Sequence, residues 1–212
     1  MSSSAAVLKP RKSPVQARSS ASVEAILDAT IQVLLSVGKE RLTTTRVAMR
    51  AGVSVGTLYQ YFPNKSALLR AALRRHLEHM RDAMREVIPR LEGAPLEEMM
   101  STVATAFLAA KMREPKTGVA LYAVSADVDG FSVAREINDE LQKMVTALLT
   151  TAKERVAEPE AVASVLLGAM GGVSRRLVES KDPERSYQAF RRELDVMVRG
   201  YARKHSPSVV QR

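Results

Sequence analysis

Three polar side chains with the spacing of one helix face lie in the short segment between Ser54 and Pro63. Gln60 and Tyr61 follow Thr57 by three and four residues, so the three side chains share an exposed surface of the helix. Gln pairs two hydrogen bonds with adenine, Thr bonds to several bases, and a Tyr hydroxyl fixes the position of a phosphate. The segment therefore predicts a surface that enters the major groove of DNA.

Two short helices joined by a tight turn are predicted to hold this surface. Thr43 to Thr45 offer hydroxyl caps for a first helix that ends near Ala51, and Gly52 takes left-handed backbone angles. Ser54 caps the second helix, which stays short because a proline follows it. This arrangement is a helix-turn-helix. An earlier helix, predicted at residues 22–38, presents an apolar stripe to it.

The string LTTTRVAMRAGVSVGTLYQYFPNKSALL at residues 42–69 resembles the TetR family of bacterial repressors. The resemblance spans Ser22 to about Leu73, and its most specific part is the pattern TT-R-VA--AGVS--TLY-YF-NK-AL. It implies an all-α fold in which a three-helix DNA-binding domain precedes a helical ligand-binding and dimerisation domain. Beyond Arg74 the resemblance is one of architecture only.

The resemblance also implies which residues contact DNA. Thr44 and Thr45, at the start of the first short helix, match phosphate contacts, which a helix N-terminus favours. Lys65 matches a phosphate-binding lysine. Tyr59 fits either a phosphate contact or partial burial, and Phe62 fits partial burial as well. The positions of the second helix that match base or phosphate contacts are Val55, Gly56, Thr57, Tyr59, Gln60 and Tyr61.

Positive charge is concentrated in the first part of the chain. The net charge is +9, and residues 1–90 hold 15 Lys and Arg against 6 Asp and Glu, whereas residues 91–212 hold 17 of each sign. Phosphate contacts by Lys and Arg dominate nonspecific affinity for nucleic acids. By itself, the asymmetry fits nucleic acid, an anionic membrane or a basic tail. Arg11, Lys12 and Arg18 of the N-terminal segment suit either flanking DNA or simple solubility.

Hydropathy and cysteine content predict a cytoplasmic protein with no membrane partner. The uncharged stretch at residues 161–174, which no other exceeds in length, falls short of the roughly 20 apolar residues that cross a bilayer. The apolar patch at residues 5–8 is too short for the core of a signal peptide. The absence of Cys agrees with a reducing compartment and excludes disulfides and thiolate catalysis.

Helical periodicity continues to the end of the chain, divided by prolines, so we expect roughly nine helices. A long helix follows Asn64 and ends before Pro89. Later helices are predicted at residues 96–112, 117–128, 131–156, 160–180 and 184–204. The predicted regions are a flexible basic arm (1–20), the DNA-binding domain (21–67), the ligand-binding and dimerisation domain (68–205) and a tail (206–212).

A homodimer and a small-molecule effector complete the prediction. One helix-turn-helix contacts few base pairs, so a symmetric dimer reads two half-sites of a palindromic operator. The last two helices carry larger apolar faces than one protomer's core requires, and we expect them to pair in a four-helix bundle. The middle helices look like the family's inducer-binding region. Candidate lining residues, each of which also fits ordinary core, are Met100, Phe107, Met112, Tyr122 and Met144.

Other chemistry has little support in the sequence. His76 and His79 lie three residues apart on one helix, but two ligands do not make a metal site, and a solvated helix surface is expected. Gly168, Gly171 and Gly172 lack phosphate-loop spacing and are expected to let two helices approach. No nucleophile-elbow pattern is present, so neither an enzyme nor a cofactor is predicted. A helical small-molecule carrier and a basic membrane-surface protein remain as alternatives, although neither accounts for the helix-turn-helix motif.

Overall fold

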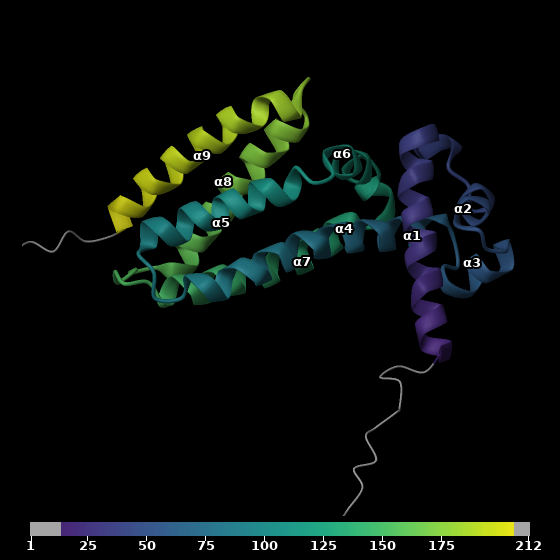
Figure 1. The fold of residues 1–212 in the computed structure, drawn as a ribbon, viewed down its shortest axis with the longest axis horizontal. Coiled ribbons are helices and arrows are strands. Elements are labelled where there is room, and N and C mark those ends of the chain that lie inside the picture. Colours follow the sequence, from purple (N-terminus) through teal and green to yellow (C-terminus); the bar gives the residue numbers. More distant parts are fainter. Residues whose placement is uncertain (1–13, 206–212) are drawn as a thin grey trace, which may run out of the picture. The chain divides into compact units, whose positions relative to one another are not determined.

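The computed structural model describes residues 14–205, and the regular elements within that range are all helical. The chain divides into two compact units, Met1–Leu68 and Leu69–Arg212. The predicted all-α fold with roughly nine helices is confirmed, because nine α-helices and two short 3-10 helices lie in this described range (Figure 1).

The first unit contains α1 (Pro14–Arg41), α2 (Thr44–Ala51), α3 (Val55–Tyr61) and the start of α4 (Lys65–Val87). α1 begins before the predicted Ser22, so part of the segment expected to be a flexible arm is helical. Proline is tolerated in a first helical turn, where its missing N–H has no partner, and good helix formers follow it. Arg11 and Lys12, the side chain of Arg18 and the tail at 206–212 lie outside the described residues.

Apolar side chains that repeat along the helices form the core of the first unit. α1 is interrupted at Gly38, the predicted stop, where φ is 76°. Before that point, α1 buries one stripe, while α2 packs against both α1 and α3. The central buried side chains are Ile26, Val33, Leu34, Val47, Ala48 and Leu58. Burial of this stripe fixes the face that each short helix turns outward.

The second unit contains the rest of α4, η1 (Ile88–Leu91), α5 (Leu96–Lys111), α6 (Pro115–Val124), η2 (Ser125–Val128), α7 (Gly130–Thr150), α8 (Pro159–Val178) and α9 (Pro183–His205). Pro115, Pro159 and Pro183 each open a helix. α7 ends before the predicted Val156. The hydroxyls of Thr150 and Thr151 donate to backbone carbonyls three residues earlier, which competes with continuation of the helix.

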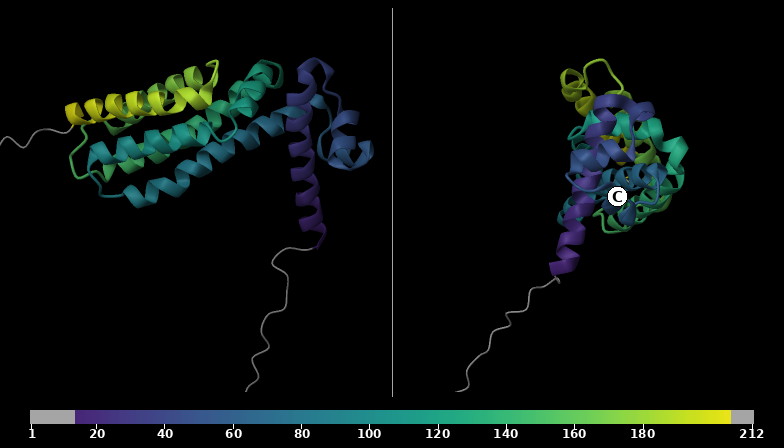
Figure 2. Two further views of the ribbon diagram at one scale, coloured as in Figure 1. Left: turned by 45° about the horizontal axis from the view of Figure 1, so that its top comes forward. Right: turned by 90° about the vertical axis from the view of Figure 1, so that its right-hand side faces the viewer.

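Long antiparallel helices dominate the second unit. α5 packs against α9 and α7 against α8, while α8 and α9 form a hairpin in which the two helices lie side by side (Figures 1 and 2). Glu97 of α5 accepts hydrogen bonds from Arg199 and Arg203 of α9 at 3.0–3.2 Å. Ser101 of α5 donates to Asp195 of α9. This polar cluster joins α5 to α9 beside the apolar core.

Two helices are long and apolar enough, by length and composition alone, to cross a membrane: Ser19–Arg41 and Pro159–Val178. Core helices of soluble proteins pass the same test. Each of these helices buries an apolar stripe in its own unit, through Ile26 and Leu34 in α1 and through Leu166 and Met170 in α8. One third of each apolar window is buried, so packing within the chain accounts for part of this hydropathy.

Candidate nucleic-acid interface and ligand cavity

The turn between α2 and α3 is built from local capping. Thr43 precedes α2, and its hydroxyl accepts a hydrogen bond from the backbone N–H of Arg46 at 3.2 Å. Gly52 ends α2 with φ of 69°, a conformation that disfavours side chains with a Cβ. Ser54 then caps α3 by accepting from the N–H of Thr57 at 2.9 Å. These contacts fix the orientation of α3 relative to α2.

α3 has one buried face and one exposed face. Leu58 is fully buried, and Phe62, directly after the helix, is also buried, so the predicted core role of Phe62 agrees with the structure. Of the predicted DNA contacts on α3, Thr57 and Tyr61 are half-buried. The exposed ones are Val55, Gly56, Tyr59 and Gln60. A short helix with this exposed face has the shape that enters a major groove.

Hydrogen bonds hold several of these side chains in place. The hydroxyls of Tyr59 and Thr44 lie 3.1 Å apart, which links α3 to the start of α2. Tyr59 is 48% exposed, so it is available to a partner rather than buried. The hydroxyls of Thr57 and Ser54 lie 2.8 Å apart. Gln60 has no side-chain hydrogen bond within residues 14–205. Both the carbonyl oxygen and the NH2 group of its amide are therefore free to bind.

Thr45 and Lys65 lie at the two ends of the motif. Thr45 is exposed in the first turn of α2. The ammonium of Lys65 donates to the backbone carbonyl of Lys39 at 2.8 Å, so this side chain also ties α4 to the end of α1. An ammonium carries three N–H groups, and the bond to Lys39 uses one of them. The other N–H groups of Lys65 can still bind a phosphate.

All the charged side chains of the segment that contains the motif are positive. Between Glu40 and Glu78 the sequence has seven Lys and Arg residues and no Asp or Glu. Arg46 and Arg50 are exposed on α2, and the Nε of Arg50 donates to Gln32 at 2.5 Å. These two arginines are not among the DNA contacts predicted above, although their spacing from the buried Val47 and Ala48 turns them outward.

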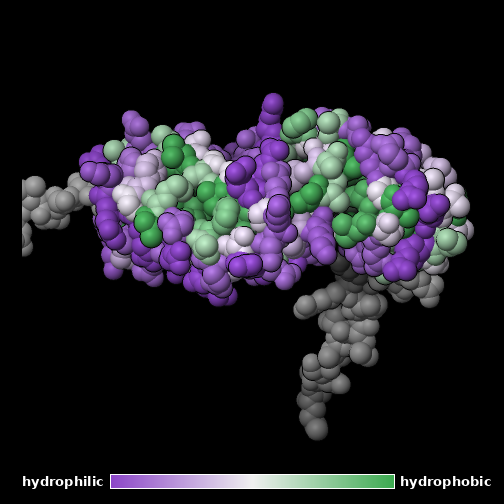
Figure 3. All heavy atoms as spheres, turned by 90° about the horizontal axis from the view of Figure 1, so that it is seen from above, coloured by the Kyte–Doolittle hydropathy of each residue, from purple (hydrophilic) through white to green (hydrophobic). Residues whose placement is uncertain are grey.

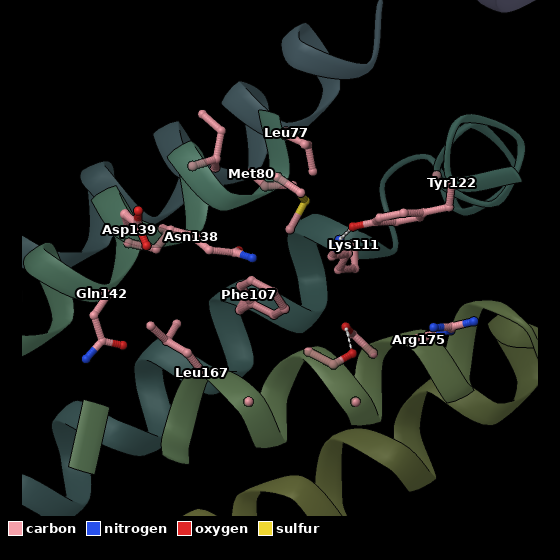
Figure 4. A pocket seen from close by; sticks show the side chains of 18 of the residues that line it. Leu77, Met80, Phe107, Lys111, Tyr122, Asn138, Asp139, Gln142, Leu167 and Arg175 are labelled. Atoms are coloured by element: carbon pink, nitrogen blue, oxygen red, sulfur yellow. Dashed lines mark hydrogen bonds between the residues drawn. The ribbon is translucent and has the colours of Figure 1, made fainter. Parts of the chain in front are cut away.

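The second unit contains a cavity of about 1760 Å³ between α4, α5, α6, α7 and α8, and it is partly open to solvent. Its walls are largely apolar, with Leu77 and Met80 of α4, Phe107 of α5 and Leu167 of α8 in view (Figure 4). Polar lining residues are fewer and include Lys111, Tyr122, Asn138, Gln142 and Arg175. Large concave apolar sites with a few polar groups are typical of small-molecule binding.

The five predicted lining residues are placed differently by the structure. Phe107 and Tyr122 line the cavity, whereas Met100, Met112 and Met144 are not among its lining residues. Met100 lies two turns before Phe107 on the same helix face, where close packing buries it completely. Met112 follows the last residue of α5. Met144 is half-buried and lies at the edge of the α7 face that carries the lining residues Ile137 and Leu141.

His76 lies in the cavity wall and is only 8% exposed, so the expected solvated position is wrong. Its Nε2 has no hydrogen-bond partner among the described residues. Burial of the imidazole, aided by the nearby ammonium of Lys111, lowers the pKa of His76 to about 4. The imidazole is therefore neutral near pH 7. Within residues 14–205, no three His, Cys, Asp or Glu residues are grouped so that they could hold a metal ion.

The glycines of α8 also line the cavity. A Cβ at Gly168, Gly171 or Gly172 would meet nothing within 4 Å. The expected close approach of two helices at these residues is therefore wrong within this chain. The missing side chains instead widen the cavity.

Apolar side chains remain exposed on α8 and α9. Val162 and Leu166 of the predicted α8 stripe are buried, but Val165 is 53% exposed. On α9, Val196 and Met197 are 61% and 44% exposed. Figure 3, which looks down on the top of Figure 1, where α9 lies uppermost, shows hydrophobic side chains among hydrophilic ones on this face. These helices therefore retain apolar area beyond what the core of one chain covers.

An exposed, positively charged helix-turn-helix followed by a helical unit with an apolar cavity defines the architecture of a ligand-binding helix-turn-helix regulator. The chain belongs to the TetR family. Residues 26–72 match the family described as bacterial regulatory proteins, tetR family. Residues 95–201 match the tetracyclin repressor-like C-terminal domain.

Curated relatives match about a third of the chain. The transcriptional repressor KstR of Mycolicibacterium smegmatis is 42% identical over 74 residues, which cover 35% of this chain and 36% of KstR. The regulator BetI of Escherichia coli is 39% identical over 70 residues, covering 33% and 34%. The matching region thus spans about a third of the length of these relatives.

Solved structures resemble nearly the whole chain in fold. A TetR-family regulator of Mesorhizobium loti has a TM-score of 0.76 at 19% identity, with 89% of this chain and 98% of that chain covered. FadR of Bacillus subtilis, solved in complex with stearoyl-CoA, has a TM-score of 0.61 at 19% identity, with 82% and 96% covered.

Proposed function

We propose that this protein is a transcriptional repressor that binds a palindromic operator as a homodimer and releases it when a small molecule binds. The observation that carries the proposal is the exposed face of α3, in a segment without a single carboxylate between Glu40 and Glu78. A groove-sized helix in a positive field suits both parts of DNA recognition: phosphate attraction and contact with base edges.

The proposed roles follow from exposure and chemistry. Gln60 reads a base, because its amide is exposed and free to form two hydrogen bonds. Thr57 and Val55 contact neighbouring base edges, while Gly56 allows the backbone to approach closely. The hydroxyls of Tyr59 and Tyr61 bind phosphates, and so do the three residues at the ends of the motif, Thr44, Thr45 and Lys65.

The dimer is proposed to form through α8 and α9. Val165, Val196 and Met197 leave an apolar surface exposed on these helices, and a second copy of the same surface covers it around a two-fold axis. Two α3 helices then read half-sites separated by about 34–36 Å, one turn of B-form DNA, or a multiple of it. Sedimentation is expected to give a dimer at micromolar concentration.

The cavity is proposed as the effector site. Phe107 and Tyr122 belong to its wall, and the apolar lining suits a ligand with a large apolar part. KstR is named as a repressor, and the FadR neighbour holds a fatty acyl thioester, so both relatives are consistent with this type of control. The ligand acts by favouring a conformation that binds operator poorly, and operator DNA weakens ligand binding by the same factor.

We propose that the protein acts in the cytoplasm, where the operator is accessible. We propose no enzymatic activity, cofactor or membrane partner for it. Selection of bound fragments from the source genome, followed by mobility-shift assays, tests it. We expect a palindromic site, salt-dependent binding, and loss of binding on Tyr61→Ala. Equal affinity for every duplex, or equal binding of anionic liposomes, would overturn the proposal in favour of a membrane-surface protein. Ligand binding without any DNA binding would favour a carrier.

A further inference from the structure

One end of the cavity carries a cation without a counter-ion. Two cationic side chains line the cavity, and one of them, Arg175, is paired with Glu179 at 2.9 Å. The other, Lys111 at the end of α5, forms no ion pair within residues 14–205. Its ammonium instead lies over the rings of Phe107 and Tyr122, 5.6 and 5.0 Å from their centroids.

Hydrogen-bond donors converge beside this ammonium. Lys111 donates to the hydroxyl of Tyr122 at 2.8 Å, which leaves the hydroxyl's own hydrogen free to donate (Figure 4). The neighbouring His76 contributes a buried Nε2 without a partner, which donates when the neutral imidazole carries its proton on that nitrogen. A Cβ at residue 118 would lie 3.4 Å from this nitrogen, so Gly118 of α6 leaves the edge of the imidazole uncrowded. A buried polar atom without a partner is costly, and a ligand oxygen removes that cost.

Carboxylates line the part of the cavity wall away from Lys111. The carboxylates of Asp139, Glu158 and Glu160 belong to the wall formed by α7 and the start of α8. They repel a negative head group from that side. A doubly charged phosphate needs a second cation for compensation, whereas a single carboxylate matches the one unpaired ammonium.

Taking the cavity as the effector site proposed above, we infer that its ligand is a monocarboxylic acid with a large apolar body. The carboxylate binds between Lys111, Tyr122 and His76, and the apolar body extends along Phe107 and Leu77. The exposed Phe131 and Val119 also line the cavity and add apolar area for the body of the ligand.

Competition for the cavity by probes that differ only in their head group tests the inference. The full-length dimer is loaded with the neutral fluorophore N-phenyl-1-naphthylamine, and dodecanoate, methyl dodecanoate and 1-dodecanol compete for it. We expect dodecanoate to bind at least about 10-fold more tightly than the two neutral probes, the typical effect of a hydrogen bond to a charged group. Equal affinities would overturn the carboxylate head while leaving an apolar effector site intact. Failure of the fluorophore to bind would overturn the effector site as well.

Matched variants locate the head group. Lys111→Met keeps the apolar stem and is expected to remove the 10-fold preference without weakening 1-dodecanol. Tyr122→Phe, which deletes only a hydroxyl, is expected to reduce the preference in part. Lys143→Met on the exposed side of α7 serves as the control and is expected to leave it unchanged. A preference retained in Lys111→Met, or lost equally in Lys143→Met, would overturn the assigned position.

Discussion

Replacement of His76 by Leu is expected to make the second unit less sensitive to acid. In the folded protein, burial and the positive charges of Lys111, His79 and Arg75 lower the pKa of His76 to about 4, while Glu114 acts in the opposite direction. The unfolded chain has the ordinary value of 6.5. Between these values the unfolded state binds more protons, so the free energy of unfolding falls as the pH falls from about 6.5 towards 4.

The size of this effect follows from the two pKa values. Each pH unit between them costs up to about 1.4 kcal/mol, so His76 removes about 2 kcal/mol of stability between pH 7.5 and pH 5. Urea unfolding monitored by circular dichroism at both pH values measures this difference. His76→Leu is expected to lose about 2 kcal/mol less than the wild type on acidification, and the exposed His79→Leu is the matched control. Identical pH dependence in His76→Leu and wild type would refute the buried, neutral imidazole.

Four further substitutions test the capping, the packing and an ion-pair cluster of the two units. Ser54→Ala removes the cap of α3 and is expected to cost about 1 kcal/mol, measured by chemical denaturation, with faster hydrogen exchange in α3; unchanged exchange would contradict the cap. Gly130→Ala places a Cβ 2.6 Å from the side chain of Leu73 and is expected to destabilise by roughly 1–3 kcal/mol, whereas Gly168→Ala, with open space around it, is expected to be neutral or stabilising. Glu97→Gln is expected to lower the melting temperature, because hydrogen bonds from Arg203 and Arg199 hold the pKa of Glu97 at about 2. That stabilisation is complete above about pH 4.5 and is lost as the pH falls towards 2, so the difference between variant and wild type must shrink on acidification.

Much of the fold follows from local sequence. Prolines open α6, α8 and α9 because their fixed φ and missing N–H suit a first helical turn, and glycine at residue 52 allows the left-handed turn before α3. The periodicity of α3 also separates the buried Leu58 from the exposed Gln60. These features depend on neighbours within a few residues, so they are readable without the tertiary structure.

The cavity depends on what distant segments leave unfilled, and local patterns miss it. Met100 and Phe107 share a face of α5, but only Phe107 reaches the space that the α8 glycines leave empty. His76 and His79 lie three residues apart on α4, so the sequence suggests the same exposed position for both. In the structure, α6 packs beside His76 and buries it. The sequence does not single out Lys111, because its lack of an ion pair depends on which charged side chains distant helices bring beside it.

The most direct test of the account is the base preference of Gln60→Ala on the operator found by genomic selection. Affinities of wild type, Gln60→Ala and Thr45→Ala are measured at fixed salt for every single-base variant of one half-site. Loss of the Gln60 amide is expected to cost about 1–3 kcal/mol and to abolish discrimination at one base pair, whereas Thr45→Ala weakens binding to all sequences alike. Wild-type affinity and wild-type discrimination in Gln60→Ala would contradict the claim that the exposed face of α3 reads DNA.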